Sequence, residues 1–436
     1  MYGSCERKVN ELGRDRGEVG GGDPGLGVGR VQRGLIIVRM AGPLAGIRVL
    51  ELATLVAGPF AGRLLADFGA EVIKVEAPGG SDPLREWGMK RHAGRTVWWP
   101  VHNRGKKLVT LDLRKPRGRD LCVRLVASCD VLVENFRPGT LERWGLGPAV
   151  LLEANPRLVI ARISGYGQTG PYAERAGFAS VGEAMGGLRY INGYPGEAPP
   201  RVGISLGDSL AALFALQGVL MGLLARDSVG GQVVDASILE SCFAILDNVV
   251  PEYGKFGYVR EPAGTRIGYA VPSNVYRSRD GRWMVVAANS DNLWRRLCVA
   301  LSRPDLLEEP RFATYTLRIE NAAEIDALVA AWVAERDAAE VDRVMSAAGL
   351  VSGPVYSVAD IFADPHYRAR EMLVSVPDPV FGELVMPGVT PKLSATPGSV
   401  PPGAGWEAGA DNASVFGALL GIDAAELSVL SGEGVI

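Results

Sequence analysis

Cysteine and histidine are scarce in this chain, and neither follows a pattern that binds metal or builds a disulfide framework. The 436 residues include five cysteines and three histidines, with no Cys-x-x-Cys pair. They stand at Cys5, Cys122, Cys129, Cys242, Cys298, His92, His102 and His366. This spacing argues against a structural metal and against a small disulfide-stabilised secreted protein. We therefore predict no metal site and a reducing compartment, the cytoplasm.

An excess of positive charge and a long apolar run are also missing. A formal net charge of −3 argues against a nucleic-acid partner, because binding to a phosphate backbone needs a basic surface. The longest uncharged apolar run covers residues 210–225, whereas a membrane-spanning helix needs about 20 residues. Asp208 lies just before this run and Arg226 directly after it. We predict a buried helix here and no membrane partner.

Residues 1–39 lack any hydrophobic period of a helix or strand. The segment is rich in glycine, mixes acids with bases, and has only a short apolar stretch before Arg39. That stretch is too short for a secretory signal, and the acids argue against a transit peptide. We predict a disordered leader or a start codon assigned too early, with Met40 as the real start.

From Gly46 onward, apolar strand-like runs alternate with helix-like segments. The runs IRVLEL, AEVIKVEA, LVTLDL, CDVLVENF and PRLVIARISGYG are separated by segments such as PFAGRLLADFG and PRGRDLCVRLVAS. Such alternation predicts βαβ units and a parallel sheet covered on both faces. We predict an α/β fold with a large Rossmann-like domain over residues 40–240. Its first βα turn, TLVAGPFAG, lacks Gly-x-Gly-x-x-Gly, so no dinucleotide is expected.

The remainder of the chain has a different pattern. The piece YRSRDGRWMVVAA reads as a hairpin with Asp280-Gly281 at its turn, and two helix-like segments follow it. We predict a smaller α+β domain over residues 264–363. Residues 364–436 are rich in proline and glycine, which is typical of an extended segment. We expect this C-terminal segment to return to the large domain and to form a short helix near residues 423–430.

Asp208 lies at the junction of a strand-like run and the long apolar helix, in the sequence ISLGDSLAALFALQG. If the helix starts at Ser209, Asp208 is an N-cap, a position that favours aspartate. Asp208 is also a candidate nucleophile, because a helix N-terminus stabilises the carboxylate form that attacks. The residues alone leave both interpretations open.

Three further stretches are candidate ligand contacts. The sequence SGYGQTGPY has glycines at 165, 167 and 170, which allow a ligand to approach the backbone closely or simply form a tight turn. In VENFRPGTLERWGLG, Asn135, Arg137 and Arg143 cluster beside Phe136, which suits an adenine ring and phosphates and equally suits a solvated helix start. We place the last group in loops after strands, where the ligands of parallel sheets bind. It comprises Arg85, Arg104, Lys106 and Lys107.

The order of these motifs resembles the class III CoA-transferase family, which includes formyl-CoA transferase, carnitine CoA-transferase and, as a sister branch, α-methylacyl-CoA racemase. The resemblance covers residues 43–394 and rests above all on ENFRPG and SGYGQTGPY. It implies CoA transfer between carboxylic acids through an aspartyl anhydride and an aspartyl-CoA thioester. The CoA thioester is then a substrate, and no tightly bound cofactor is expected.

The resemblance also implies a set of roles and an assembly. The nucleophile is the aspartate of the Gly-Asp pair, here Asp208, and residues 40–240 bind CoA. The implied CoA contacts are Asn135, Phe136 and Arg143, with Arg85 and Lys107 on phosphates. The implied assembly is a homodimer in which two chains interlock like links.

The chain departs from formyl-CoA transferase in its first turn, at a phosphate contact and in its active-site flap. Val56 replaces a glutamine, Ala77 replaces an arginine, and TRIGYAVPSNVY replaces a glycine-rich flap. These differences argue against formyl-CoA or oxalate as substrates.

Two other functions have to be weighed against CoA transfer. A racemase needs an acid/base pair beside an α-carbon, and racemases of the family carry His-Asp where this chain has Phe178 and Ala179. Glu183, one helical turn further on, is a candidate to replace the acid missing at Ala179 or is only a capping acid. A catalytically inert CoA-binding protein is the third possibility, and the presence of Asp208 argues against it.

The segment GFASVGEAMGGLRYINGYPGEAPPRVGISLGD most resembles family members that use succinyl-CoA with dicarboxylic acids. A second substrate carboxylate needs a cationic partner. Arg189, Arg201 and Arg266 lie in segments that surround the active site in the family, and each is otherwise a surface or CoA-contacting residue. We expect succinyl-CoA as donor and a dicarboxylate as acceptor.

Overall fold

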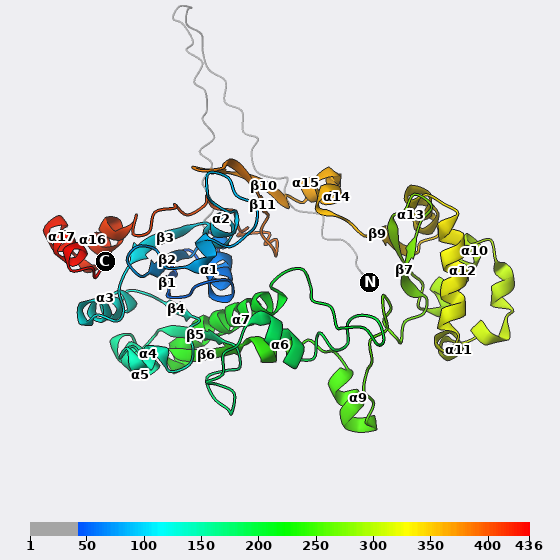
Figure 1. Cartoon of the computed structure of the whole chain (residues 1–436), viewed down its shortest axis with the longest axis horizontal. Helices are drawn as coiled ribbons and strands as arrows, with labels where there is room; N and C mark the ends of the chain where they lie inside the picture. Colours follow the sequence, from blue (N-terminus) through cyan, green and yellow to red (C-terminus); the bar gives the residue numbers. More distant parts are fainter. Residues whose placement is uncertain (1–41) are drawn as a thin grey trace, which may run out of the picture. The chain divides into compact units, whose positions relative to one another are not determined.

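Six parallel strands form the main sheet of residues 42–436, the part of the chain that this computed structural model describes. The strands are Arg48–Glu51 (β1), Glu71–Glu76 (β2), Lys106–Thr110 (β3), Val131–Glu134 (β4), Val159–Ser164 (β5) and Gln232–Ser237 (β6). Their order is β3-β2-β1-β4-β5-β6, which can be followed in Figure 1. The order reverses between β1 and β4, as in a Rossmann-like sheet, and this confirms the predicted fold class. The predictions for residues 1–39 lie outside the described residues.

Helices cover both faces of this sheet. One face packs on α1 (Ala57–Asp67) and α7 (Leu206–Val229), which contribute small side chains such as Ala61 and Ala215 to the core. The other face packs on α3 (Pro116–Val126) and α5 (Pro148–Ala154), which contribute leucines such as Leu125 and Leu151. All residues of β4 and β5 are buried, which explains why they read as continuous apolar runs.

Shorter helices lie between these elements. They are α2 (Trp98–Asn103), α4 (Thr140–Arg143), α6 (Ala179–Met185), α8 (Ile238–Phe243) and α9 (Val249–Phe256), with a 3-10 turn at Pro83–Arg85.

A separate antiparallel sheet has its own hydrophobic core. It consists of β7 (Ser273–Arg277), β8 (Trp283–Ala287) and β9 (Val351–Pro354), in that order. The pairing of β7 with β8 confirms the predicted hairpin, and Gly281 at its turn has a φ of 81°. The helices of this region are α10 (Asp291–Ala300), α11 (Tyr315–Glu320), α12 (Ala322–Ala334) and α13 (Ala338–Ala347). Met284, Leu297 and Val329 are fully buried in its core.

The C-terminal residues contain more regular structure than their composition indicates. They form α14 (Val358–Ala363), α15 (Pro365–Ala369), the hairpin of β10 (Leu373–Asp378) and β11 (Gly382–Pro387), α16 (Asn412–Leu420) and α17 (Ala424–Gly432). Side chains from the start of α16 accept hydrogen bonds from the edge strand β3: Leu108 N donates to Asp411 and Thr110 N to Asn412. Phe416 and Leu430 are fully buried against the main sheet. These contacts cover an edge that would otherwise be open.

The long helix α7 is buried on one face only. Its buried residues are Gly207, Ala211, Ala212, Ala215, Val219 and Gly222, whereas Met221 and Leu224 are largely exposed. The prediction of a buried helix therefore holds for one face only, because small residues form only the stripe that contacts the sheet. Within residues 42–436, α7 is the single continuous helix with the length and apolarity to cross a bilayer. The pair α16 and α17, bent by 120°, meets the same criterion only if it is taken as one span.

Candidate functional site

Asp208 is the third residue of α7, so it lies within the first turn of the helix and not at its cap. The helix begins at Leu206, and Ser205 is the N-cap residue. The interpretation of Asp208 as an N-cap is therefore wrong. The glycine before Asp208 suggests that the helix starts after it, but Gly207 is itself part of the helix. Asp208 still lies in the first turn, where the helix dipole favours a negative charge.

Glu183 from α6 lies beside the start of α7. Its side chain is buried, and Oε1 accepts a hydrogen bond from Gly207 N at 3.0 Å. This contact satisfies one of the N–H groups that a helix start leaves without a partner. Of the two roles that the sequence left open for Glu183, the geometry favours the capping acid.

The surroundings of Asp208 make its carboxyl group less acidic than usual. Burial is the largest cause, and the nearby charge of Glu183 adds to it, so that the pKa of Asp208 rises from 3.8 to about 6. Arg201 acts in the opposite direction. Asp208 is thus ionised at neutral pH, but its charge is poorly solvated.

Close backbone contact fixes the starts of α6 and α7 relative to each other. A methyl group on Gly207 would lie 2.9 Å from Cγ2 of Ile238 and 3.2 Å from the carbonyl oxygen of Ala179. Only glycine fits at this position without movement of its neighbours. The contact therefore helps to set where Asp208 stands.

Asp208 opens onto a cleft with a volume of about 590 Å³. Aromatic side chains form much of its wall, and polar groups are few. The aromatic residues are Trp87, Trp98 and Phe178, and the polar side chains are Ser180, Arg201, Ser205 and Asp208. Phe178 and Ala179, the positions where racemases of the family carry His-Asp, line this same cleft.

A second, smaller cavity of about 120 Å³ lies at the carboxyl ends of β1 to β4. This is the crevice where the strand order reverses, the usual ligand position in such sheets. Phe136 and Trp144 line it and meet edge to face, with ring centroids 5.1 Å apart. Arg114, which follows β3, also lines it and is largely exposed.

Of the predicted CoA contacts, Asn135 and Phe136 lie at this crevice. Asn135 Oδ1 accepts from Thr54 N at 2.9 Å, and Asn135 Nδ2 donates to Thr54 O at 2.7 Å. This reciprocal pair ties the first βα turn to the end of β4. Arg143 precedes Trp144, is exposed, and donates to Thr140 Oγ1 at 2.8 Å.

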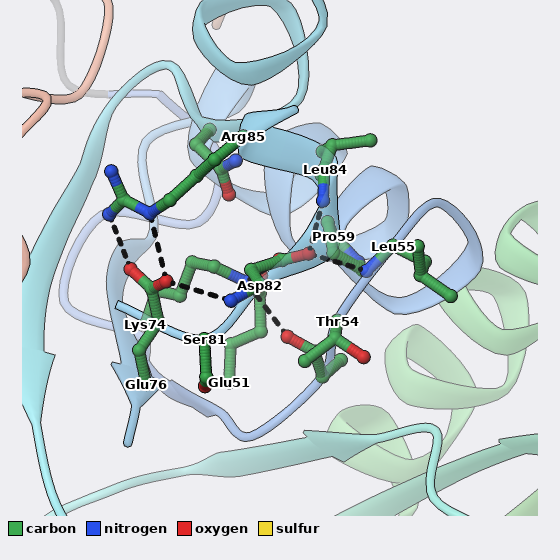
Figure 2. A network of polar contacts seen from close by, with 12 residues as sticks. Glu51, Thr54, Leu55, Pro59, Lys74, Glu76, Ser81, Asp82, Leu84 and Arg85 are labelled. Carbon is green, nitrogen blue, oxygen red and sulfur yellow. Dashed lines mark hydrogen bonds and ion pairs between the residues drawn. The ribbon is translucent and has the colours of Figure 1, made fainter. Parts of the chain in front are cut away.

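The guanidinium group of Arg85 is already engaged within the protein. It pairs with both oxygens of Glu76, donates to Trp406 O at 2.6 Å, and lies 3.6 Å from the ring centroid of Trp99. Figure 2 shows this pairing with Glu76. Its charge is therefore neutralised before any phosphate arrives.

Lys106 and Lys107 are the first two residues of β3, so their predicted position in a loop after a strand is wrong. Lys107 Nζ contacts Glu71, the first residue of β2, at 2.6 Å. Because parallel strands begin at the same edge, Lys107 lies at the edge opposite to the crevice. Arg104 is buried and pairs with both carboxylate oxygens of Asp67.

Sequence reasoning missed Arg114 and Trp144 as crevice residues. The available signal was positional, because Arg114 comes soon after the last residue of β3. The basic residues of HNRGKK were predicted as ligand contacts instead.

A buried ionic network supports the first βα turn (Figure 2). Lys74 Nζ lies 2.8 Å from Asp82 Oδ2 and 3.2 Å from Glu51 Oε1. Asp82 Oδ1 in turn accepts hydrogen bonds from the N–H groups of Leu55 and Leu84, each at 3.0 Å. Leu55 has a φ of 63°, a left-handed conformation that is unusual for leucine. Asp82 thus holds a strained residue in place, next to the Thr54 that Asn135 binds.

In the glycine-rich loop after β5, residues 165–170, some backbone N–H groups already donate hydrogen bonds to side chains of the protein. Gly167 N donates to Ser164 Oγ, and Gln168 N donates to Asp235 Oδ2, both at 2.9 Å. A methyl group on Gly165 would lie 2.9 Å from Cα of Gly177. At Gly165 the need for glycine is therefore a close backbone contact within the chain.

Residues 42–436 contain no group of three or more His, Cys, Asp and Glu side chains placed to hold a metal ion.

Comparison with known proteins gives a consistent result. The family model "CoA-transferase family III" matches residues 44–412. The chain is 49% identical to a succinyl-CoA–D-citramalate CoA-transferase of Chloroflexus aurantiacus, over 90% of this chain and 98% of that protein. It is 34% identical to a succinyl-CoA:glutarate CoA-transferase of Mus musculus, over 87% of this chain and 86% of that protein.

Solved structures agree with the sequence comparison. A CaiB/BaiF family protein from Brucella suis superimposes with a TM-score of 0.77 at 31% identity, covering 87% of this chain and 100% of that one. The resemblance that the motifs indicated is thereby confirmed. This chain belongs to CoA-transferase family III.

Proposed function

We propose that this chain moves CoA from succinyl-CoA to a second dicarboxylic acid through covalent intermediates on Asp208. The observation that carries the proposal is a partly buried carboxylate in the first turn of a helix, facing a cleft of about 590 Å³. The substrate assignment draws support from relatives named as succinyl-CoA-dependent transferases acting with citramalate, malate and glutarate.

The first half of the reaction requires no proton transfer. A carboxylate oxygen of Asp208 attacks the thioester carbonyl of succinyl-CoA, and the C–S bond breaks to release CoA thiolate. The product is a mixed anhydride of Asp208 and succinate. The thiolate then attacks the Asp208 carbonyl, which expels succinate and leaves an aspartyl-CoA thioester.

The second half reverses these steps with another acid. The carboxylate of the acceptor attacks the aspartyl-CoA thioester, and the returning thiolate attacks the acyl carbonyl of the new anhydride. The products are the new acyl-CoA and the free carboxylate of Asp208. Each attack passes through a tetrahedral oxyanion, so backbone N–H donors are needed near the cleft. Gly203 lines the cleft, and a methyl group added to it would meet nothing within 4 Å, so we propose its N–H as one such donor.

The raised pKa of Asp208 fits its proposed role as a nucleophile. A pKa of about 6 keeps the carboxylate ionised at neutral pH while making it more basic than an exposed aspartate. Poor solvation of the charge further favours attack on a neutral carbonyl.

For CoA itself, we propose the crevice at the carboxyl ends of β1 to β4 within residues 40–240. Asn135, Phe136 and Arg143 remain the proposed contacts, and Arg114 is a better placed phosphate ligand than Arg85 or Lys107. Arg114 lines the crevice cavity and is largely exposed, although it pairs with Asp112, whereas Arg85 is buried in its pair with Glu76 and Lys107 lies at the opposite edge. Residues 264–363 and 364–436 stay proposed as a small domain and a returning segment.

The racemase alternative has little support from the geometry. Phe178 and Ala179 line the cleft and neither can transfer a proton. Glu183 is buried and bound to Gly207 N, so it is not positioned as a free base. An inert CoA-binding protein would need neither a nucleophile nor a cleft at this position.

We also propose an interlocked homodimer in the cytoplasm. The exposed apolar face of α7, with Leu213, Met221 and Leu224, supports a partner surface. Native mass spectrometry should give a dimer at micromolar concentration, and an active monomer would contradict this part of the proposal.

The decisive activity test is isotope exchange between succinyl-CoA and labelled succinate, because it needs no knowledge of the natural acceptor. Wild type should exchange the label, and Asp208→Ala should reduce the rate at least 10³-fold, an order of magnitude typical for loss of a nucleophile, while still binding CoA. Exchange by Asp208→Ala within about tenfold of wild type would refute the assignment.

A further inference from the structure

Arg201 is the one basic residue among the described residues that line the Asp208 cleft. It belongs to the loop that leads into α7, five residues before the helix begins at Leu206. The charge of Arg201 acts on the carboxyl group of Asp208. Both side chains line one cleft, into which an acyl group attached to Asp208 has to extend.

Within residues 42–436, Arg201 makes no ion pair and no hydrogen bond. The two other arginines that the sequence suggested as partners of the second substrate carboxylate already have partners within the protein. Arg189 donates to Pro199 O at 3.0 Å, and Arg266 lies 3.3 Å from a carboxylate oxygen of Asp326. An incoming anion can thus pair with Arg201 without breaking a contact inside the protein.

The rest of the cleft wall offers an anion no second cation. Trp87, Trp98 and Phe178 are large and aromatic, and Val202 and Gly203 follow the arginine in the chain. An acidic group that enters this cleft therefore has Arg201 as its one cationic partner among the described lining residues. Arginine also presents a planar fork of donors that matches a carboxylate with two parallel hydrogen bonds.

We propose that Arg201 binds the substrate carboxylate that does not react, and so makes the site specific for dicarboxylic acids. This inference rests on the proposed function, because it concerns the acid half of the same reaction. Both half-reactions form an anhydride on Asp208, so the leaving and the entering acid occupy the same space in turn. Arg201 therefore binds the unreactive carboxylate of the donor's succinyl group and, later in the cycle, that of the acceptor acid.

The test compares two acids of nearly equal shape, succinate and its monoamide succinamate, as acceptors from succinyl-CoA in wild type and Arg201→Gln. Measurements at pH 8 keep Asp208 ionised, so that a change in its pKa does not contribute. For succinate, Arg201→Gln should lower kcat/KM by about 10- to 100-fold, mainly through KM, as expected for one charged hydrogen-bonded pair. For succinamate, the change should stay within about threefold.

Arg175→Gln is the matched control. Arg175 is exposed, stacks on the ring of Tyr172 at 3.9 Å, and does not line the cleft, so its loss should alter neither acid. Arg201→Lys should recover part of the preference for succinate, because it restores the charge without the fork.

Three results would overturn the inference while leaving CoA transfer intact. Equal losses for both acids would mean that Arg201 acts on Asp208 or on the loop. An unchanged succinate rate in Arg201→Gln would mean that another group holds the second carboxylate. Equal kcat/KM values for succinamate and succinate in wild type would mean that the site does not recognise the charge of the second carboxylate. Absence of exchange in wild type would instead refute the proposed function.

Discussion

Asp208 and Glu183 are two acids from neighbouring helix starts, and the environment assigns them different roles. Glu183 is buried and holds the N–H of Gly207, whereas Asp208 faces the cleft. The family resemblance implied Asp208 as the nucleophile through its Gly-Asp pair and left the role of Glu183 open. Spacing along the chain could not decide, because the contact joins residues 24 positions apart.

The rate of the first chemical step should depend on the ionisation of Asp208. Burial and Glu183 raise the pKa of Asp208 to about 6, and only the carboxylate attacks, so kcat/KM for succinyl-CoA should rise with pH and level off above that value. Glu183→Gln keeps an acceptor for Gly207 N but removes the charge, so the rise should move to lower pH. A profile that is flat between pH 5 and 8 in wild type would contradict this account.

The ionised carboxylate of Asp208 should lower the free energy of unfolding at neutral pH. Its pKa is raised above the unfolded value of 3.8, so its contribution favours the fold below pH 3.8 and is lost as pH rises through about 6. Asp208→Asn should therefore be more stable than wild type at pH 8, by up to about 3 kcal/mol, and nearly equal to it at pH 4. Urea unfolding at the two pH values measures this, and a destabilised Asp208→Asn at pH 8 would contradict it.

The cations were the least predictable residues of the site. Arg85 and Lys107 were expected to bind phosphate, yet each pairs with a glutamate brought near by the sheet. Whether an arginine is free depends on tertiary partners, which a single sequence does not display. Arg201 and Arg189 look alike in the sequence, but Arg201 lines the Asp208 cleft, whereas Arg189 donates a hydrogen bond to Pro199 O.

Among the elements, the junction of α6 and α7 places Asp208, the proposed nucleophile. Gly207→Ala adds a methyl group 2.9 Å from Ile238 Cγ2, so α7 must shift at its start and carry Asp208 with it. We expect kcat/KM to fall by about 10- to 100-fold, since displacements near 1 Å have such effects. Overall stability should change by only about 1–2 kcal/mol, because alanine favours the helix.

Gly432→Ala in α17 is the control for that substitution. A methyl group on Gly432 meets nothing within 4 Å, so activity should not change. If Gly207→Ala also keeps full activity, the close contact does not position Asp208.

The buried ionic network beneath the first βα turn should contribute more to the free energy of unfolding than ion pairs on the surface do. Asp82→Ala leaves the buried Lys74 with one carboxylate partner fewer and frees the N–H groups of Leu55 and Leu84. We expect a loss of about 3–5 kcal/mol in the free energy of unfolding. In a Leu55→Gly background the loss should be smaller, because glycine adopts a φ of 63° without strain. Equal losses in both backgrounds would show that Asp82 does not hold the turn.

Element prediction succeeded where a residue pattern was strong and failed where composition misled. Strands β1 to β5 of the main sheet and the β7–β8 hairpin were predicted from apolar runs and turn residues, whereas the partly exposed edge strand β6 was not. The β10–β11 hairpin and α16 were missed, because prolines and glycines around them read as an extended tail. The start of α7 was placed three residues late, at Ser209, because Gly207 reads as a helix stop.

At the scale of the whole molecule, alternating strands and helices predict a parallel sheet, but not which segments complete it. The fully buried Phe416 and Leu430 join the core beside helices about 300 residues earlier in the chain. The side chains of Asp411 and Asn412 bind the edge strand β3. No local pattern encodes these pairings, which depend on the shape of the finished sheet.

The central claim is that CoA becomes covalently attached to Asp208. Wild type is mixed with succinyl-CoA, quenched in acid and digested, and the peptides are mapped by mass spectrometry, with a parallel sample treated with hydroxylamine. We predict a CoA adduct on the peptide that contains Asp208, converted to a hydroxamate in the treated sample and absent from Asp208→Ala. An adduct on Glu183, or turnover without any covalent adduct, would contradict the account.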